Sequence, residues 1–424
     1  MYLGLQFIKI VTDTGVFFNI DRRNEVPDTI LEYLEKHGDD DFACLPFGEV
    51  DALILSQFSY LKFDHFFREK DPDDLHMTGL DRIISSPDFD SLFSDLRYEK
   101  NNRKLFELMS LGRRFSDLSL GGYMNIVDRK RDIQFSAVTF SFPSGPSFVA
   151  YRGTDENMVG WKEDFNLSIL DRIPGEEEAV RYLEKVSGSL SGSFYVGGHS
   201  KGGLLAVYAS SLVPDLIKER IINVYCFDSP AIREDIRVRT GYPLIRDRIL
   251  KYVPQSSLIG MIFETDDIYH VIRSSALGVL QHDPYTWVVR DTAFEPRPAL
   301  DKSAQIVNGS VSKWIGELDT EERSHFIDII FKVADACDED DLVSISLNPI
   351  RNLRQMLDGY EEMAEGEKQF LKQVINGLAK ETEGNAVNEM HSGFSEFIES
   401  VDRWIEKEKS RRGITYGTHS RRDT

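Results

Sequence analysis

One serine, Ser200, stands among closely spaced glycines where one apolar run ends and another begins. The stretch reads Phe194-Tyr195-Val196-Gly197-Gly198-His199-Ser200-Lys201-Gly202-Gly203-Leu204-Leu205-Ala206. Its first part predicts a strand, its last part predicts a helix, and the G-x-S-x-G pattern forms the turn between them. Such a sharp turn strains the serine backbone, and Gly198 and Gly202 must be small for strand and helix to pass closely. We therefore expect the Ser200 hydroxyl to be exposed at the carboxyl edge of a sheet, with the helix N-terminus behind it.

The elements expected around this turn alternate between strand and helix. Strands are expected at 135–140, 148–151, 194–196, 221–227 and 249–253, and helices at 176–186 and 204–212. Further strands are expected at 260–263, 269–273 and 286–289, as an antiparallel hairpin or extension. This order favours an α/β fold with a mostly parallel sheet covered by helices.

The regions on either side of this core have helical patterns. Residues 1–115 form a helical lead-in or cap, with helix-like segments at 29–35, 50–60 and 104–113. We assign 116–295 to the α/β core, 296–408 to a helical C-terminal region and 409–424 to a disordered tail.

Charge and cysteine content exclude several classes of protein. Among 424 residues, 71 acidic side chains outnumber 50 basic ones, and a net charge of −21 repels nucleic acids and anionic membranes. Cys44, Cys226 and Cys337 are too few and too scattered for a disulfide framework. The acidic clusters 39–41 and 266–267 lack a calcium-loop pattern and are expected to be solvated turns. With no signal peptide or transmembrane segment evident, we expect a cytoplasmic protein that needs no cofactor or metal.

Three segments together resemble a known group. Residues 198–203, Phe148-Val149-Ala150-Tyr151-Arg152-Gly153-Thr154 and Trp161-Lys162-Glu163-Asp164 resemble the class 3 (fungal-type) lipases of the α/β-hydrolase superfamily. They are still more similar to an uncharacterised bacterial lipase-like family, over roughly residues 30–295. The resemblance implies an α/β-hydrolase-type fold and a serine nucleophile at Ser200.

Two backbone amides are candidates for binding an oxyanion. The resemblance implies Thr154, and a loop just after a strand near the elbow can aim its N–H at the developing charge. Lys201, which begins the helix after the serine, would supply the second N–H. The Lys201 side chain either holds an anionic substrate or lies on the helix surface. Trp161 and Asp164 either support the oxyanion loop, as the resemblance suggests, or mark a capped helix start.

A serine hydroxyl needs a base and an orienting acid, which in this superfamily follow in the order serine, acid, histidine. His282, on a loop before a late strand, is the expected base. His270, within a strand pattern, is the reserve. His199 is expected to pack beneath the elbow, because a neighbour in sequence points away from Ser200.

The acid is where the sequence departs from class 3 lipases. Those enzymes place an aspartate after a later strand, whereas Lys251-Tyr252-Val253-Pro254-Gln255-Ser256-Ser257 offers only serines. Asp228, at the end of the strand that follows the nucleophile helix, is the preferred acid, with Asp266 or Asp267 as alternatives. Asp228 could instead cap the next helix, leaving a slower Ser-His dyad.

Together these residues predict a serine hydrolase that cleaves a carboxylic ester through an acyl-enzyme. Whether the substrate is a lipid, a short acyl ester or a thioester stays open. The alternative is a catalytically degenerate hydrolase-fold protein that binds partners through its acidic helical C-terminus, and the missing acid after Val253 favours it.

Overall fold

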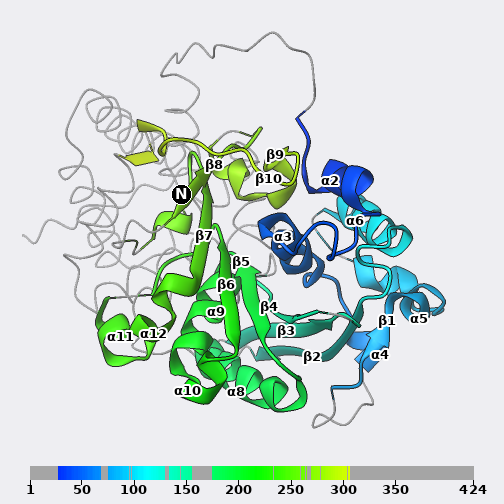
Figure 1. The fold of residues 1–424 in the computed structure, drawn as a ribbon, viewed down its shortest axis with the longest axis horizontal. Coiled ribbons are helices and arrows are strands. Elements are labelled where there is room, and N and C mark those ends of the chain that lie inside the picture. Colours follow the sequence, from blue (N-terminus) through cyan, green and yellow to red (C-terminus); the bar gives the residue numbers. More distant parts are fainter. Residues whose placement is uncertain are drawn as a thin grey trace, which may run out of the picture. The chain divides into compact units, whose positions relative to one another are not determined.

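A mixed sheet of eight strands forms the centre of the computed structural model (Figure 1). The structure describes residues 27–305, apart from 68–74, 95, 97, 129–132, 144, 155–173, 233, 258, 263, 265–268, 277 and 303. All described residues belong to one compact unit of the chain. The C-terminal helices expected after residue 305 and the tail at 409–424 lie outside the described residues, so they stay predictions.

The strands lie in the sheet in the order in which they occur in the chain, from β1 to β8. β1 to β4 pair antiparallel, and β4 to β8 pair parallel. Their bounds are β1 Thr78–Gly79, β2 Ser119–Asp128, β3 Ile133–Ser141, β4 Ser147–Tyr151, β5 Phe194–His199, β6 Ile221–Phe227, β7 Ile249–Pro254 and β8 His270–Ile272. A separate antiparallel pair joins β9 (Val289–Arg290) to β10 (Ala293–Phe294).

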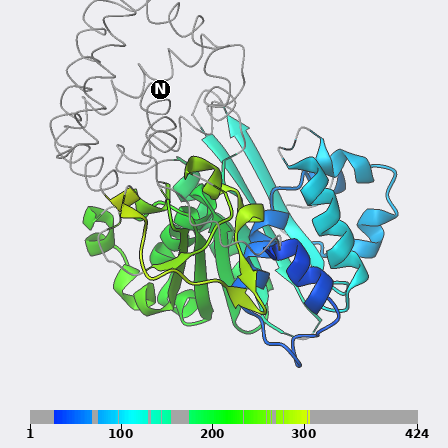
Figure 2. The same ribbon diagram turned by 90° about the horizontal axis from the view of Figure 1, so that it is seen from above.

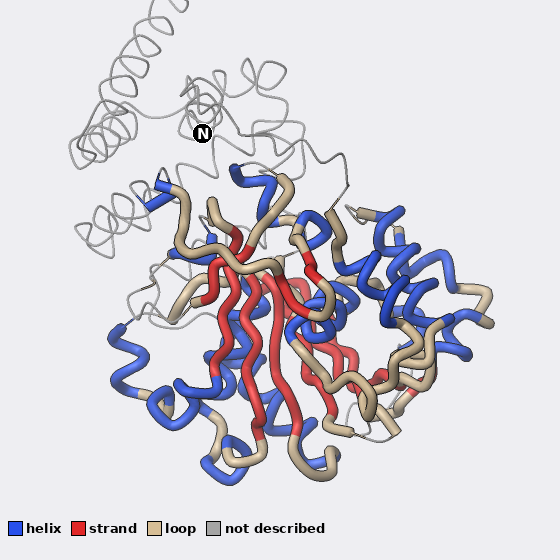
Figure 3. Tube along the Cα trace, turned by 45° about the horizontal axis from the view of Figure 1, so that its top comes forward, coloured by secondary structure: helices blue, strands red, loops and turns tan. Residues whose placement is uncertain are grey.

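Helices cover both faces of the sheet (Figures 2 and 3). α2 (Ile30–His37), α3 (Glu49–Phe58) and α6 (Glu99–Leu111) pack on one face, and α8 (Pro174–Ser189) and α9 (Lys201–Leu212) on the other. Shorter elements are α4 Asp64–Phe67, α5 Leu80–Ile84, α10 Asp215–Lys218, α11 Glu234–Arg239, α12 Tyr242–Ile245, and the 3-10 turns η1 Phe89–Phe93, η2 Arg246–Arg248, η3 Ile259–Met261, η4 Gly278–His282 and η5 Pro284–Thr286.

Strand β4 shows how the sheet separates the two cores. Its side chains alternate, with Phe148 and Ala150 in the core beneath the N-terminal helices and Val149 and Tyr151 in the core beneath α8 and α9. All five residues of β4 are buried. A strand covered on both faces reads as a nearly continuous apolar run, which is why β4, β5 and β6 consist mainly of apolar residues.

The structure corrects two of the expected strands. Gly260 lies in the 3-10 turn η3 rather than in a strand at 260–263. Thr286 ends the 3-10 turn η5, and of the strand expected at 286–289 only Val289 lies in a strand, β9. In both places a short apolar run resembles a strand in its sequence, but the backbone forms a 3-10 turn.

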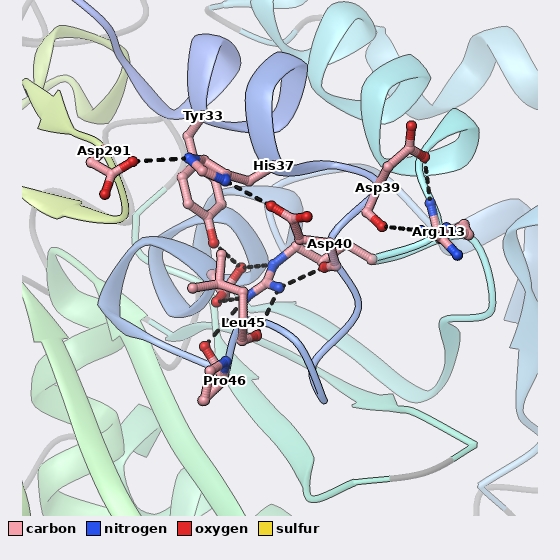
Figure 4. A network of polar contacts seen from close by, with 10 residues as sticks. Tyr33, His37, Asp39, Asp40, Leu45, Pro46, Arg113 and Asp291 are labelled. Atoms are coloured by element: carbon pink, nitrogen blue, oxygen red, sulfur yellow. Dashed lines mark hydrogen bonds and ion pairs between the residues drawn. The ribbon is translucent and has the colours of Figure 1, made fainter.

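A buried ion pair holds the N-terminal helices together. Arg114 donates from Nε and Nη2 to the Asp51 carboxylate, at 2.7 and 2.6 Å, and both side chains are almost fully buried. Tyr33 Oη also donates to Asp51 at 3.0 Å. The remaining Arg114 donors reach backbone carbonyls of the loop after α2, among them Leu45 (Figure 4). This network links α2, α3 and the chain after α6.

Candidate active site

Ser200 occupies a strained turn between β5 and α9. Its backbone has φ 58° and ψ −132°, in the left-handed half of conformational space that non-glycine residues seldom adopt. Its N–H donates to the carbonyl of Phe227, at the end of β6, at 2.8 Å. In the described ranges only four non-glycine residues have positive φ, and Asp228 is another of them. Strain of this kind costs about 1–3 kcal/mol and gathers at functional sites.

The glycines around Ser200 are needed for close contact with the neighbouring strand. A Cβ atom on Gly202 would lie 2.1 Å from the carbonyl oxygen of Tyr151, at the end of β4. A Cβ on Gly198 would lie 2.4 Å from the same oxygen and 2.5 Å from the Gly202 carbonyl carbon. The start of α9 can therefore pass against β4 and β5 only because both positions lack a side chain.

A carboxylate and an imidazole meet beside this turn. Asp228 follows β6 directly, and its Oδ2 lies 2.6 Å from Nδ1 of His282 at the end of η4. The Asp228 side chain is buried, whereas the His282 side chain is 22 % exposed. A hydrogen bond from Nδ1–H to a carboxylate leaves Nε2 as the basic nitrogen of a neutral ring.

The second oxygen of Asp228 is held by the segment that follows β7. Ser257 Oγ makes a short hydrogen bond to Asp228 Oδ1, and the N–H of Gly260 donates to the same oxygen at 3.1 Å. This segment begins where class 3 lipases are expected to carry their acid. In this chain it binds a carboxylate supplied by the neighbouring strand instead of providing one.

His199, the residue before the serine, connects the Ser200 turn to His282. His199 Nε2 lies 2.9 Å from the carbonyl oxygen of His282, and the two imidazole ring centres are 4.5 Å apart. No hydrogen bond joins Ser200 Oγ to the His282 ring, although both residues are described. Catalytic hydrogen bonds are often long in unliganded sites and tighten when substrate binds.

The loop after β4 lies directly against the serine. A Cβ on Gly153 would stand 3.2 Å from Ser200 Cβ and 2.7 Å from the carbonyl oxygen of His199. Thr154 is the next residue of this loop. Lys201 is the first residue of α9, where N–H groups point out of the helix end. Both expected oxyanion donors thus belong to segments that adjoin Ser200.

The Lys201 side chain does not lie on the helix surface, as one of the two expectations had it. Lys201 is 2 % exposed, and its Nζ donates to the backbone carbonyl of Gln134 on β3 at 3.0 Å. Because α9 is buried along almost its whole length, a residue in its first turn has no exposed face to occupy. The ammonium is directed into the protein toward β3.

Of the other candidate residues named above, His270 is the one that the structure describes. His270 is exposed on β8 and stacks on Tyr252, with ring centres 5.1 Å apart. Asp266, Asp267, Trp161 and Asp164 lie outside the described residues. The sequence reasoning overlooked Ser257 and Gly260 as partners of Asp228, although an isolated glycine next to an apolar run is a known signal of close backbone approach.

The described part of the chain has neither a membrane-spanning helix nor a cluster of metal ligands. There, no helix is long and apolar enough to cross a membrane. Within the same ranges, no group of three or more histidine, cysteine, aspartate or glutamate side chains is arranged to hold a metal ion. Cys44 and Cys226 are free thiols, the first exposed and the second buried.

Among known proteins, the chain is similar to a solved lipase and matches the model of one family. The crystal structure of M37 lipase is similar at 15 % identity, over 51 % of this chain and 69 % of that one, with a TM-score of 0.32. No curated protein matches. The family model of the Mbeg1-like proteins matches residues 109–332, just over half of the chain, and includes both the serine turn and the Asp228–His282 pair. The chain belongs to the Mbeg1-like family, a lipase-like family.

Proposed function

We propose that the chain is a serine hydrolase with an α/β-hydrolase-type fold, which cleaves a carboxylic ester through an acyl-enzyme on Ser200. The observation that carries the proposal is the strained Ser200 turn with a hydrogen-bonded Asp228–His282 pair beside it. That the chain belongs to a lipase-like family supports the same class of reaction.

In the proposed mechanism, Ser200 Oγ attacks the acyl carbon while His282 Nε2 accepts the hydroxyl proton. Asp228 holds the Nδ1–H of His282, which keeps Nε2 basic and stabilises the imidazolium that forms. The tetrahedral intermediate collapses, and His282 returns the proton to the leaving alcohol. Water, activated by the same imidazole, then releases the acid from Ser200.

The amides of Thr154 and Lys201 are proposed to hold the oxyanion of the tetrahedral intermediate. The closeness of Gly153 to Ser200 Cβ supports Thr154, because it brings the loop to the reacting atom. The position of Lys201 at the start of α9 supports its amide as the second donor. In serine hydrolases one such donor lowers the barrier by about 3–4 kcal/mol.

The alternative of a degenerate site depended on the missing acid after Val253. The Asp228–His282 hydrogen bond supplies a carboxylate from the neighbouring strand, and this supports the enzyme over the binding module. The acidic C-terminal region that the alternative requires lies outside the described residues.

Labelling with a fluorophosphonate probe tests the proposal directly, because the probe phosphonylates an activated serine hydroxyl. We expect the full-length protein to be labelled, and Ser200→Ala to abolish the labelling. The matched control is Ser256→Ala, which removes a hydroxyl that bonds to Asp301 near the surface. Absence of labelling in folded wild-type protein, shown by circular dichroism and a cooperative thermal transition, would reject the proposed function.

A further inference from the structure

Two successive hydrogen bonds connect Tyr60, in the turn after α3, to the backbone of His282 through the ring of His199. Tyr60 Oη lies 3.2 Å from His199 Nδ1, and His199 Nε2 lies 2.9 Å from the carbonyl oxygen of His282. A carbonyl oxygen can only accept, so Nε2 must carry the proton. In a neutral ring Nδ1 then accepts from the Tyr60 hydroxyl. The two partners therefore select one tautomer of His199.

The environment of His199 keeps its ring neutral. His199 is 5 % exposed, and its pKa lies well below the usual value of 6.5, chiefly because of burial. Repulsion from the His282 imidazole acts in the same direction, and the hydrogen bond to the His282 carbonyl acts in the opposite one. Among the described residues, the titratable groups that contact it are Tyr60, from the turn after α3, and His282, from η4. Because His199 stays uncharged, it does not compete with His282 for the proton that the reaction transfers.

Tyr60 also touches the loop that follows β4. A Cβ on Gly153 would lie 2.2 Å from Tyr60 Oη, which is closer than any real contact. The hydroxyl of Tyr60 therefore lies where this loop meets the turn of Ser200. Any movement of Tyr60 would disturb Gly153 and His199 together.

His199 gives the main chain of His282 an anchor of its own, beside those that hold the preceding Gln281. His282 is the last residue of η4, a 3-10 turn of five residues, and such turns have poorer hydrogen-bond geometry than α-helices. Asp228 fixes one ring atom of His282, and a ring held at a single atom can still tilt about that contact. A second fixed point on the carbonyl, supplied by His199, restricts that motion.

We propose that His199, held in its Nε2-protonated form by Tyr60, is a positioning residue that fixes the backbone of His282 and so directs the imidazole toward Ser200. The inference rests on the proposed function, since it assigns His282 the role of the base. It adds that the N-terminal helical region takes part in building the site.

Substitutions at His199 separate positioning from packing. In the full-length protein, His199→Leu fills the space but cannot donate to the carbonyl, whereas His199→Gln keeps an amide donor. We expect the Leu variant to lower the maximal rate of fluorophosphonate labelling by on the order of 10²-fold, with a nearly unchanged half-saturating probe concentration. His199→Gln should recover most of the lost labelling rate. The rate of Tyr60→Phe should lie between those of the Leu and Gln variants.

Two conservative changes outside the site serve as controls. His65→Gln alters an exposed histidine in α4, and Tyr123→Phe removes a hydroxyl that donates to Asp64 at 3.0 Å. Both should label at the wild-type rate. The inference is overturned if His199→Leu labels as fast as wild type, or if the Gln variant is as slow as the Leu variant. An unlabelled but folded wild type would instead overturn the proposed function, and the positioning role with it.

A spectroscopic measurement tests the hydrogen bond without any activity. Protein labelled with ¹⁵N-histidine gives ring signals in a long-range ¹H–¹⁵N correlation spectrum. The set of ring signals that is absent from the spectrum of His199→Gln belongs to His199. We expect the shifts of a neutral ring protonated at Nε2. A ring protonated at Nδ1 would overturn the inference whatever the labelling rates, because Nε2 could not then donate to His282.

Discussion

Gly260 approaches Asp228 so closely that a Cβ atom on the glycine would stand 2.4 Å from Asp228 Oδ1 and 2.6 Å from Val253 Cγ1. The missing side chain allows the Gly260 N–H to reach the carboxylate at 3.1 Å. Asp228 is thus carried by β6 but oriented by the turn that follows β7. In the proposed mechanism the direction of its other oxygen, toward His282, depends on this contact.

Gly260→Ala should therefore reduce the reactivity of Ser200. The added methyl must displace the Asp228 carboxylate or η3, because the colliding carboxylate and Val253 are both buried. We expect the rate of fluorophosphonate labelling to fall by about tenfold or more, together with a lower melting temperature. Gly188→Ala in α8 is the matched control, since a Cβ there meets nothing within 4 Å. Equal labelling rates in the two variants would contradict this account of Asp228.

Ser257→Ala tests the other contact to the same oxygen. The hydroxyl of Ser257 donates to Asp228 Oδ1 in a buried setting. A hydrogen bond to a charged group contributes about 1.5–3 kcal/mol, so a loss of about tenfold in labelling rate is expected if part of that energy orients the acid. The neighbouring Ser256→Ala should have little effect, because Ser256 bonds to Asp301 at the exposed edge. A Ser257→Ala variant that labels like Ser256→Ala would show that Asp228 needs no such support.

The sheet could be predicted from the sequence where both of its faces are buried. The parallel strands β4 to β7 are apolar runs and appear at nearly the expected positions. Strand β2 was missed, because its Gly121 and Gly122 interrupt the pattern and its register shifts between Gly121 and Met124. A Cβ on Gly121 would lie 2.1 Å from the Leu75 carbonyl oxygen, so the glycine reflects a tertiary contact that no periodicity reveals.

The candidate site, too, could be predicted only in part from the sequence. Ser200 could be found from local sequence, because a strand, a glycine turn and a helix follow one another without interruption. Asp228 could be preferred as the partner of His282, but local patterns could not establish the pairing, since 54 residues separate the two in the chain. The contacts of Tyr60 with His199 and of Ser257 with Asp228 join segments whose meeting depends on how the helices and turns pack around the sheet.

Breaking the buried ion pair between Arg114 and Asp51 is expected to destabilise the protein strongly. Arg114→Met would leave the Asp51 carboxylate buried without its cation, and breaking such a pair costs about 3–5 kcal/mol. Arg113→Met, one residue earlier and exposed, should change the free energy of unfolding by less than about 0.5 kcal/mol. Chemical denaturation of both variants measures the difference. If Arg114→Met were no less stable than Arg113→Met, the pair would not hold the helices together.

The buried neutral ring of His199 should make the protein less stable in mild acid. Its pKa in the folded state lies well below 6.5, while in the unfolded chain it is about 6.5, so below that pH the unfolded state binds one more proton. This group therefore lowers the free energy of unfolding as the pH falls below 6.5, by up to about 1.4 kcal/mol per pH unit until its folded-state pKa is reached. The His199→Gln variant lacks this pH-dependent contribution to the free energy of unfolding. We expect the melting-temperature advantage of wild type over this variant to shrink between pH 7 and pH 5, whereas the exposed-site control His65→Gln should follow wild type at both. An advantage that stays constant across this range would mean that His199 is not held neutral by burial.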